Sequence, residues 1–421
     1  MSLKSKGMNH NSRLLFKNTL MLYILQFSTY LFSFITVPYQ TRVLGPEIYG
    51  VLGVVGAVMM YFQLFMDFGF LLSATEDISK NRTDFHYVCK KLTSITLIKV
   101  VFAAVCFGVM AVLCAVVGKF AEHRSLYFIY LAAFVINSFL PDYVFRGLED
   151  MSAVTLRTVL IKFISCIMVF VFLRTEEDYM LVPAFLLIGN AIAVLFAYAY
   201  LFKKYKYRFE KVTASEIFHD FKRSSVFFYS RIATTVYSAT NTVVLGMVDQ
   251  AGIITGCYTS ADKVVNMVKN GLSPISDSLY PYMVKNRDFK LVKKILLIFM
   301  PIIVVGCAMV GIFAEPLCVF VFGAEYADAA AILRAFLPAV VATLPSYIFG
   351  FPTLGAMGLS KYANYSIFVG SIVHIAGIVL MLINGSITGV TLAAMTSVSE
   401  WIILSCRIIA VYRNRNIMKG A

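Results

Sequence analysis

The stretch that decides the fold is residues 224–281, which read SSVFFYSRIATTVYSATNTVVLGMVDQAGIITGCYTSADKVVNMVKNGLSPISDSLYP. It is typical of two helices joined by a short turn at 248–252, and each helix is long enough to cross a bilayer, which takes about 20 residues. Both helices carry polar side chains, although a charge at membrane depth costs about 2.5–3.5 kcal/mol even on a lenient scale. The polar residues recur every three or four positions: Arg231, Thr234, Ser238 and Asn241, then Asp262, Asn266, Lys269, Ser273 and Asp277, with Lys263 beside Asp262.

This spacing places each set of polar residues on one face of its helix. We interpret the two faces as the wall of a polar and mostly cationic cavity inside a membrane protein. Two alternatives stay open, because Ser, Thr and Asn side chains also bond across packed helices, and Asp262 and Lys263 could form a local ion pair. Arg231, Lys263 and Lys269 favour the cavity, since helix packing does not require three cations.

The composition excludes a soluble globular domain. The chain has 421 residues, of which 59% are hydrophobic and 14% charged, and its mean hydropathy is +0.78. Eight cysteines occur without the spacing of a metal site or a redox pair, and we expect them, like His374, to be packed core residues. The segment before residue 18 resembles the start of a signal peptide, but no small-residue cleavage site follows, so the next apolar segment is predicted to be retained.

The apolar segments predict an all-α integral membrane protein with twelve transmembrane helices. They are predicted at residues 14–38, 48–73, 92–117, 126–147, 152–173, 180–202, 224–247, 252–284, 292–314, 330–355, 362–383 and 387–411. The long connection after the sixth helix divides them into two six-helix bundles, which we predict to surround a central cavity. The predicted domains are an N-terminal bundle at 1–205, a basic cytoplasmic linker at 206–223 and a C-terminal bundle at 224–421.

Lys and Arg are distributed unevenly between the two sides of these predicted helices. The termini and every second connection hold most of them, with Arg146 and Arg157 assigned to the connection after the fourth helix. Because cytoplasmic loops carry the excess of Lys and Arg, this pattern predicts that both termini are cytoplasmic. It also explains the net charge of +14 by contact with anionic membrane lipids, so no nucleic acid partner is expected. The opposite connections contain only Arg42, Lys119, Arg124 and Arg174.

A short repeat supports the division into two bundles. Residues 141–148 and 352–359 both read P-x5-G-L, and they end the fourth predicted helix of each half. The first predicted helix also carries a polar stripe that includes Gln26, which matches the stripe of the seventh. Two halves with an even number of helices would be parallel repeats, related by an axis along the membrane normal.

Proline and glycine residues mark two of the predicted helices. Pro338, Pro345 and Pro352 are seven residues apart in the tenth, and therefore on one face, while Gly271 and Pro274 interrupt the eighth. Proline removes a backbone donor and kinks a helix. We predict that these five residues are gating hinges; a static bend is an equally good interpretation.

The sequence contains no motif that binds a nucleotide, a zinc ion or another cofactor. No Ser/His/Asp set is present, and the predicted connections are too short for a soluble catalytic domain, so no cofactor, metal or catalytic residue is expected. Asp67, Asp142, Glu400 and Arg407 are candidates for an enzyme acting within the membrane. We interpret them instead as charges near helix ends that reach the membrane interface.

Several segments resemble one family of membrane proteins, the bacterial Wzx-type polysaccharide flippases. Residues 38–50, PYQTRVLGPEIYG, are similar to the signature P-Y-x-T-R-x-L-G-P-E-x-Y-G of that family. Further similarity lies at DFGFLLSA (67–74), at YTSADK (258–263), which resembles Y-S-A-A-x-K, and at FGAEY (322–326). Residues 141–151 resemble P-x-W-x-F-Q-G-L-E-x-M, with Tyr143 and Arg146 in place of Trp and Gln.

This resemblance places the chain in the multidrug/oligosaccharidyl-lipid/polysaccharide exporter superfamily. It implies two six-helix bundles around a central cavity, alternating access, a bacterial inner membrane location and an undecaprenyl-pyrophosphate-linked oligosaccharide as substrate. The expected partners are that glycolipid, membrane lipids, and the polymerase and chain-length regulator of the same pathway. The alternatives are a drug exporter of the same superfamily and a membrane-embedded polysaccharide polymerase.

The predicted substrate-binding residues belong to the polar stripes. Arg231, Lys263 and Lys269 are expected to neutralise the pyrophosphate or acidic sugars, because a charged donor lowers the cost of burying an anion. Asn241, Asn266 and Gln26 are expected to form hydrogen bonds with sugar hydroxyls, and Asp262 lies on the same helical face as Asn266 and Lys269. An apolar rim would close the cavity on one side at a time.

Overall fold

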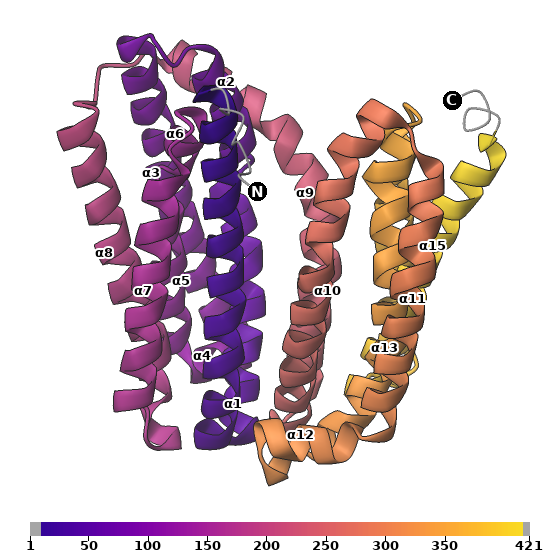
Figure 1. Cartoon of the computed structure of the whole chain (residues 1–421). Coiled ribbons are helices and arrows are strands. Elements are labelled where there is room, and N and C mark those ends of the chain that lie inside the picture. The colour runs from indigo at the N-terminus through magenta and orange to yellow at the C-terminus, as the bar shows by residue number, and fades with distance from the viewer. Residues whose placement is uncertain (1–9, 416–421) are drawn as a thin grey trace, which may run out of the picture. The chain divides into compact units, whose positions relative to one another are not determined.

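The computed structural model describes residues 10–415, except for the side chains of residues 10–16, 19, 229, 230, 233, 234, 236–238 and 281. Every element in this range is helical (Figure 1). Two predicted stripe residues, Thr234 and Ser238, therefore lie outside the described side chains, as do the terminal basic residues Lys4, Lys6, Arg13 and Lys419. The helices form two compact units, one from Met1–Val43 and Val58–Ile232 and the other from Leu44–Ala57 and Ala233–Ala421.

Unit 1 combines most of α1 (His10–Asp67) and the first part of α9 (Ala214–Val248) with the helices between them. These are α2 (Phe70–Lys80), α3 (Phe85–Val116), α4 (Gly118–Glu122), α5 (Arg124–Ser138), α6 (Asp142–Gly147), α7 (Met151–Phe172), η1 (Glu176–Met180) and α8 (Leu181–Lys204). The long helices α3, α5, α7 and α8 run alongside α1 (Figure 1). Helix α8 packs on both α5 and α7, which gives this unit a helix-bundle core.

Unit 2 contains the rest of α9 and all the helices that follow it. They are α10 (Ile253–Asn286), α11 (Phe289–Ile312), α12 (Ala314–Phe322), η2 (Ala324–Tyr326), α13 (Ala329–Ile348), η3 (Phe349–Gly355), α14 (Ser360–Ile383) and α15 (Gly389–Arg413). Helix α13 lies at the centre of the unit and packs against α10, α11 and α15. Its central place fits its sequence, since most of its residues are apolar and buried.

The first two predicted transmembrane helices are joined into α1, which bends at Gly45. This residue has φ 66° and ψ 170°, and it precedes Pro46, whose ring disfavours a helical conformation in the residue before it. The segment Leu44–Ala57 that follows the bend belongs to unit 2. There it lies so close to α10 that a Cβ atom on Gly256 would be 1.9 Å from the carbonyl oxygen of Pro46. Only glycine permits this close backbone contact.

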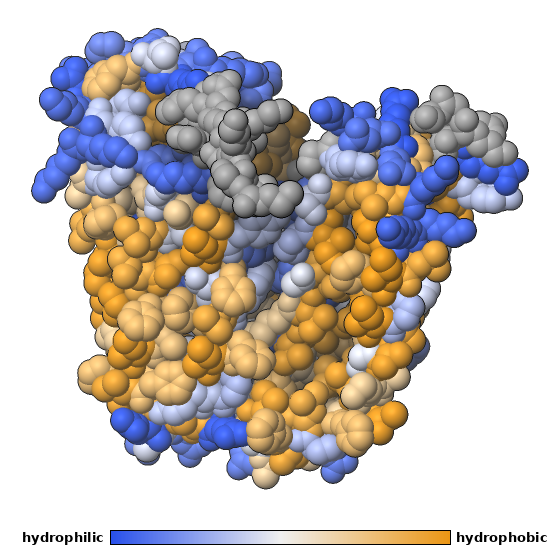
Figure 2. Space-filling view, in the orientation of Figure 1, coloured by the Kyte–Doolittle hydropathy of each residue, from blue (hydrophilic) through white to orange (hydrophobic). Residues whose placement is uncertain are grey.

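The helices have the length and composition of membrane-spanning segments. Within the described residues, nine of them are long and apolar enough to cross a membrane, and α9 and α10 are not among the nine. On each unit, apolar side chains cover the middle of the surface and hydrophilic ones gather at the ends (Figure 2). The chain is therefore a multi-pass α-helical membrane protein. The arrangement of twelve helices in two repeats stays a prediction.

The predicted domain boundaries can be compared with the two units. Residues 214–232, assigned in part to the linker and in part to the C-terminal bundle, pack in unit 1, where Ser224 Oγ lies 2.7 Å from Ser73 Oγ. Lys91 of α3 also binds both Asp220 of α9 and Asp77 of α2. These buried contacts explain why the compact unit extends beyond the predicted linker. The division into two six-helix bundles remains a prediction.

The predicted hinges lie in helices of different regularity. Pro338 and Pro345 are inside α13, while Pro352 lies in the π-helix η3, which bends at Gly350 with ψ −123°. Helix α10 runs without a break through Gly271 and Pro274. A bend therefore occurs beside one of the predicted prolines, and the gating role of all five residues stays a prediction.

Candidate functional site

Unit 2 contains a cavity of about 250 Å³, which we call cavity C, between α10, α13, α14 and α15. It brings together four residues of the predicted polar stripes: Asn241, Asp262, Asn266 and Lys269. Three residues of the stripe on α10 therefore face a cavity, as the helical spacing predicts, whereas Ser273 and Asp277 are not among its lining residues. The same cavity is lined by Glu400 and Arg407 of α15, which come from more than a hundred residues further along the chain.

The charges that line cavity C are balanced and largely bound to other groups. Lys269 forms an ion pair with Glu400, and the two side chains are 13% and 10% exposed. Arg407 donates hydrogen bonds to the carbonyl oxygen of Ser346 at 2.6 Å and to Ser366 Oγ at 2.9 Å. Asp262 accepts a bond of 2.8 Å from Asn266. Two carboxylates and two cations thus line this cavity.

Asn241 belongs to a buried hydrogen-bond network. Its Nδ2 donates to the hydroxyls of Tyr258 and Thr396, both at 2.9 Å, and its Oδ1 lies 2.9 Å from His374 Nε2. His374 Nδ1 lies 3.0 Å from Ser399 Oγ. His374 is therefore a packed residue, as predicted. The amide of Asn241 is used within the protein, so a sugar hydroxyl would have to replace one of these bonds.

Lys263 is directed toward an aromatic ring. Its Nζ donates to the hydroxyl of Tyr49 at 2.7 Å and lies 4.6 Å from the centre of that ring. Tyr49 is almost completely buried in unit 2. The local pair between Asp262 and Lys263, considered from the sequence, is replaced by this contact with Tyr49. Lys263 is not among the residues that line cavity C.

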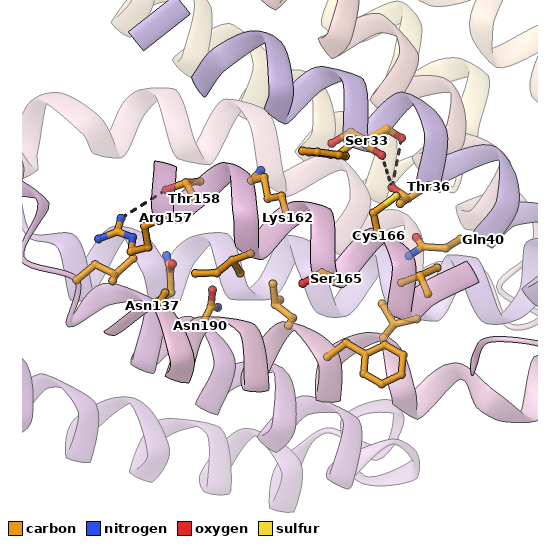
Figure 3. Close-up of a pocket in the computed structure, with 18 residues that line it drawn as sticks. Ser33, Thr36, Gln40, Asn137, Arg157, Thr158, Lys162, Ser165, Cys166 and Asn190 are labelled. Carbon is orange, nitrogen blue, oxygen red and sulfur yellow. Dashed lines mark hydrogen bonds between the residues drawn. The ribbon is translucent and has the colours of Figure 1, made fainter. Parts of the chain in front are cut away.

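Unit 1 contains two neighbouring cavities. Cavity A, of about 290 Å³, lies between α1, α5, α7 and α8 (Figure 3). Cavity B, of about 400 Å³, lies on the side of α2, α3 and α6. The two share a wall formed by Asn137, Leu140, Arg157, Thr158 and Lys162.

Cations outnumber carboxylates in cavity B. The lining cations are Lys99, Arg146, Arg157 and Lys162, and the lining carboxylates are Asp67 and Asp142. Gln26, predicted from the first polar stripe, lies in the same wall and donates to the hydroxyl of Tyr30 at 2.7 Å. The sequence predicted a cavity with an excess of cations. Cavity B of unit 1 has such an excess, although most of the residues predicted for it lie elsewhere.

Lys99 and Arg157 are fixed inside unit 1 by different partners. Lys99 donates to the carbonyl oxygen of Ser138, and its Nζ lies 5.7 Å from the ring centre of Tyr143. Arg157 Nη2 donates to Asp142 Oδ1 at 2.9 Å, and the Arg157 side chain is only 3% exposed. Both cations are therefore held in place before any ligand binds.

Arg231 approaches this charged group from α9. Its Nη1 lies 3.9 Å from Asp67 Oδ2, and its side chain is 44% exposed. A pair at this distance is weak, because exposed ion pairs contribute only about 0.2–1 kcal/mol. Of the three predicted cations, Lys269 lines cavity C, Lys263 contacts Tyr49 and Arg231 approaches Asp67. Within unit 2, Lys263 and Lys269 therefore have different partners, and Arg231 belongs to unit 1.

The interpretation of Glu400 and Arg407 as interfacial charges near helix ends is wrong, because both are buried within α15. Asp67 ends α1 and Asp142 begins α6, so these two do lie at helix ends. Asp142 binds Arg157, Glu400 binds Lys269, and Arg407 is buried among α13, α14 and α15. Asp67 lines cavity B. The assignment of Arg157 to a cytoplasmic connection is also wrong, because this residue lies inside α7. Each charge stays within the bundle because a partner of opposite charge or a carbonyl group compensates for lost hydration.

The sequence contained signals for the cavities of unit 1. Thr158, Lys162 and Ser165 have the spacing of one helical face within the apolar segment of α7, and all three line cavity A. Tyr143 and Arg146, the two departures from the resembled motif, both line cavity B. At this position Arg146 adds a cation where the motif has Gln. Polar residues within apolar segments and departures from a motif both indicated this region.

Outside the membrane-spanning helices, Asp150 connects α6 and α7 to the end of α8. Its Oδ2 accepts hydrogen bonds from Lys204 at 2.9 Å and from the hydroxyls of Tyr205 and Tyr200 at 2.8 and 3.2 Å. Burial raises the pKa of Asp150, but these bonds outweigh it and the pKa lies below the usual value. The carboxylate therefore stays ionised at neutral pH and fixes the end of the α6 region.

A family model described as "Polysaccharide biosynthesis protein" matches residues 15–287, and the chain belongs to that family. The family membership indicated by residues 38–50 is thereby confirmed. Two relatives are both named "Putative O-antigen transporter". The one from Escherichia coli (strain K12) is 28% identical over 69% of this chain and 70% of its own length. The one from Shigella dysenteriae is 27% identical over 85% of this chain and 91% of its own length.

Solved structures share the fold at low sequence identity. The inward closed conformation of the lipid II flippase MurJ has a TM-score of 0.69 and 12% identity, and covers 94% of this chain and 87% of that one. An inward-facing multidrug resistance MATE family transporter has a TM-score of 0.68 and 14% identity, and covers 94% of this chain and 98% of that one. The chain has the fold of these transporters.

Proposed function

We propose that the protein is a flippase that moves undecaprenyl-pyrophosphate-linked oligosaccharide repeat units from the cytoplasmic to the periplasmic leaflet of the bacterial inner membrane. It would act by alternating access and supply the synthesis of O-antigen, capsule or exopolysaccharide. The observation that carries the proposal is the pair of cavities in unit 1. They place buried cations beside amide and hydroxyl groups, inside helices with the composition of membrane spans.

The chemistry of a lipid-linked sugar explains why such cavities are needed. A sugar hydroxyl without a hydrogen-bond partner costs several kcal/mol in hydrocarbon, and an ionised phosphate costs far more. Charge-assisted hydrogen bonds from Arg and Lys stabilise phosphate and carboxylate oxygens. A head group bound among these side chains can cross the membrane while its polyprenyl chain stays in lipid. Arg231, Lys263, Lys269, Asn241, Asn266, Gln26 and Asp262 stay the residues proposed from the sequence for this role.

A drug exporter is the second candidate, since the fold is shared with a multidrug transporter. A cationic drug is bound by carboxylates, and two of the four in cavities B and C are already neutralised, since Glu400 is paired with Lys269 and Asp142 with Arg157. The excess of cations in cavity B argues against such a substrate. The flippase is therefore the better proposal.

Deletion of the gene tests the proposed activity. Lipid-linked single repeat units should accumulate on the cytoplasmic leaflet, because the step that exposes them to the periplasm is lost. The measurement is the accessibility of the accumulated glycolipid to a periplasmic probe in intact cells, compared before and after permeabilisation. Re-expression of the wild-type chain is the control and should restore polymer.

Loss of a polymerase would give a different result in the same assay. Single units would then accumulate on the outer side, where the probe reaches them without permeabilisation. Full accessibility in the deletion strain would therefore disprove the flippase and favour an enzyme. Both termini and the basic connection at 206–223 should be cytoplasmic in reporter fusions, and a periplasmic signal there would disprove the proposed orientation.

A further inference from the structure

The wall shared by cavities A and B contains two cations with unused hydrogen-bonding capacity. Arg157 and Lys162 both belong to α7 and both line the two cavities. Asn137 of α5 and Thr158 of α7 complete the polar part of this wall. Figure 3 shows Arg157 and Lys162 on the same stretch of α7, with Asn137 and Asn190 nearby.

Arg157 is buried, but only some of its hydrogen-bond donors have partners. Its Nη2 binds Asp142 Oδ1 at 2.9 Å and is 3.5 Å from Thr158 Oγ1, whereas Nε and Nη1 are buried without any hydrogen-bond partner among the described residues. Leaving a buried donor unpaired is unfavourable, and more so for a charged group. A guanidinium group can bind two anions at once, because its donors form a planar fork. Arg157 therefore keeps two donors that no described group satisfies, and an anion at the shared wall would supply acceptors for them.

Lys162 has still fewer contacts. Its ammonium group forms no hydrogen bond or ion pair with the described part of the chain, although the side chain is half-buried within the bundle. Cavity A has no carboxylate among its lining residues, so no carboxylate of that cavity neutralises Lys162. Arg146, whose Nε is buried and has no hydrogen-bond partner in the described part of the chain, adds a third cation in cavity B.

Neutral polar groups extend from this wall along cavity A. The lining residues with amide or hydroxyl groups are Ser33, Thr36, Gln40, Asn137, Ser165 and Asn190. Such groups form hydrogen bonds with sugar hydroxyls, and each face of the cavity supplies some of them. Cavity B, at about 400 Å³, has the volume typical of a small-molecule site, which is roughly 300–1,000 Å³.

We infer that unit 1 contains an anion-binding site on the wall shared by cavities A and B, in which Arg157 and Lys162 bind one acidic group of a glycan head group. The attached sugar lies in cavity A against Asn137, Asn190 and Gln40. This assignment deepens the proposed function and rests on it. The acidic group is either the diphosphate of the lipid carrier or the carboxylate of an acidic sugar, since both present the paired oxygens that Arg and Lys bind.

The test is a binding measurement on the purified full-length protein in detergent, by isothermal titration calorimetry. Three probes are compared: inorganic pyrophosphate, glucuronate and glucose. The wild-type protein should bind at least one of the two anions about tenfold or more tightly than glucose, as expected for one charge-assisted hydrogen bond. Tighter binding of pyrophosphate assigns the site to the carrier diphosphate, and tighter binding of glucuronate assigns it to an acidic sugar.

Two variants connect this binding to the site. Lys162→Gln removes the charge without leaving a partner unpaired, and it should weaken anion binding about tenfold or more. Arg157→Lys keeps the charge beside Asp142 but removes the planar fork, and it should also weaken binding. Lys203→Gln is the matched control, because Lys203 is an exposed lysine of α8 in the same unit and should leave anion binding unchanged.

The inference is overturned if the wild-type protein binds neither anion more tightly than glucose, or if both Lys162→Gln and Arg157→Lys keep wild-type anion affinity. Size-exclusion profiles establish whether each variant is folded. If Lys162→Gln is misfolded, the anion affinity of Arg157→Lys decides the result. Binding does not require transport, so failure of this site leaves the deletion-strain result unaffected. The two proposals can therefore fail independently.

Discussion

Cavity B of unit 1 and cavity C of unit 2 contain similar residue types but differ in how their charges are used. In cavity C, Lys269 is paired with Glu400, and Arg407 is bound to Ser346 and Ser366. Cavity B is lined by four cations and two carboxylates, and two nitrogen atoms of Arg157 have no partner among the residues that the structure describes. The comparison shows that the availability of a charge depends on its neighbours more than on its presence in a membrane helix.

The energetics of buried ion pairs explain the difference in role. A buried pair contributes little net stability compared with an apolar pair, but loss of one partner leaves an uncompensated charge and costs about 3–5 kcal/mol. The charges of cavity C are therefore expected to maintain the structure of unit 2. The cations of unit 1 that lack partners can contribute to binding, since a ligand anion would complete their coordination.

Substitution of Lys269 should have the largest effect and tests whether cavity C is structural. Lys269→Met leaves Glu400 buried without its partner, so the free energy of unfolding should fall by about 3–5 kcal/mol. Folded protein and polysaccharide export should both be lost. The measurements are thermal unfolding in detergent and the amount of surface polymer in a complemented deletion strain.

The double variant Lys269→Met/Glu400→Gln is the matched control. It removes both charges, so it should recover most of the stability lost in the single variant. Recovery of export as well would show that Lys269 does not bind the substrate. Equal destabilisation in the single and double variants would contradict the structural role of this pair.

In unit 1, Lys162→Gln should leave stability nearly unchanged but reduce export. No partner is left unpaired, so the free energy of unfolding should change by less than about 1 kcal/mol, the centre of the distribution for single substitutions. Export should nevertheless be strongly reduced, because the cation is available to the ligand. Surface polymer is measured at matched protein level, with Lys203→Gln as the control. Normal export by Lys162→Gln would remove the functional difference between the two cavities.

Much of the fold could be predicted from the sequence. The predicted apolar segments coincide closely with α7, α8, α11 and α14, because a long apolar run determines a membrane helix locally. The turn at 248–252 is present, with Gly252 at φ 76° before α10. The bend at Gly45 was predicted only as a connection between two helices. The continuity of α1 through this bend depends on packing against α10, and the local sequence does not specify that packing.

The candidate site was predicted less completely, for a definite physical reason. Helical spacing correctly indicated that Asp262, Asn266 and Lys269 share a face, but it could not show that Glu400, 131 residues away, neutralises Lys269. Arg157 was counted with the cations of a connection, and the sequence did not show that Asp142 pairs with it in unit 1. Pairing between distant helices decides which charges remain available, and a single sequence does not contain that information directly.

Substitution of Arg231 is expected to have a smaller effect on stability than substitution of Lys269. Its pair with Asp67 is long and the side chain is 44% exposed, so Arg231→Ala should lower stability by only about 0.2–1 kcal/mol. If Arg231 binds the substrate, Arg231→Ala should abolish surface polymer while the protein remains in the membrane. Arg231→Lys should keep part of the export, since the charge is retained but the planar fork is not. Normal polymer with Arg231→Ala at normal protein level would exclude this residue from the site.

The smallest effect is expected at Glu216, outside the membrane-spanning helices, which provides a solvent-exposed reference for the buried pairs. Its carboxylate accepts from the backbone N–H of Thr213 at 2.7 Å and from Lys90 Nζ at 2.9 Å, and the Thr213 hydroxyl caps the first turn of α9. These bonds lower the pKa of Glu216 to about 2. Because the pKa in the folded state is lowered, the stabilisation is present above the unfolded pKa of about 4.3 and is lost as pH falls toward 2.

Glu216→Gln should therefore cause a slight loss of stability at pH 7, measured by thermal unfolding in detergent, and leave export unchanged. The difference between wild type and variant should diminish as pH is lowered from about 4.3 toward 2, since protonation removes the same charge in the wild type. Salt should also weaken the effect, because exposed charges are screened. A destabilisation as large as that of Lys269→Met would mean that exposure does not separate the two kinds of ion pair, and the contrast between cavities B and C would lose its physical basis.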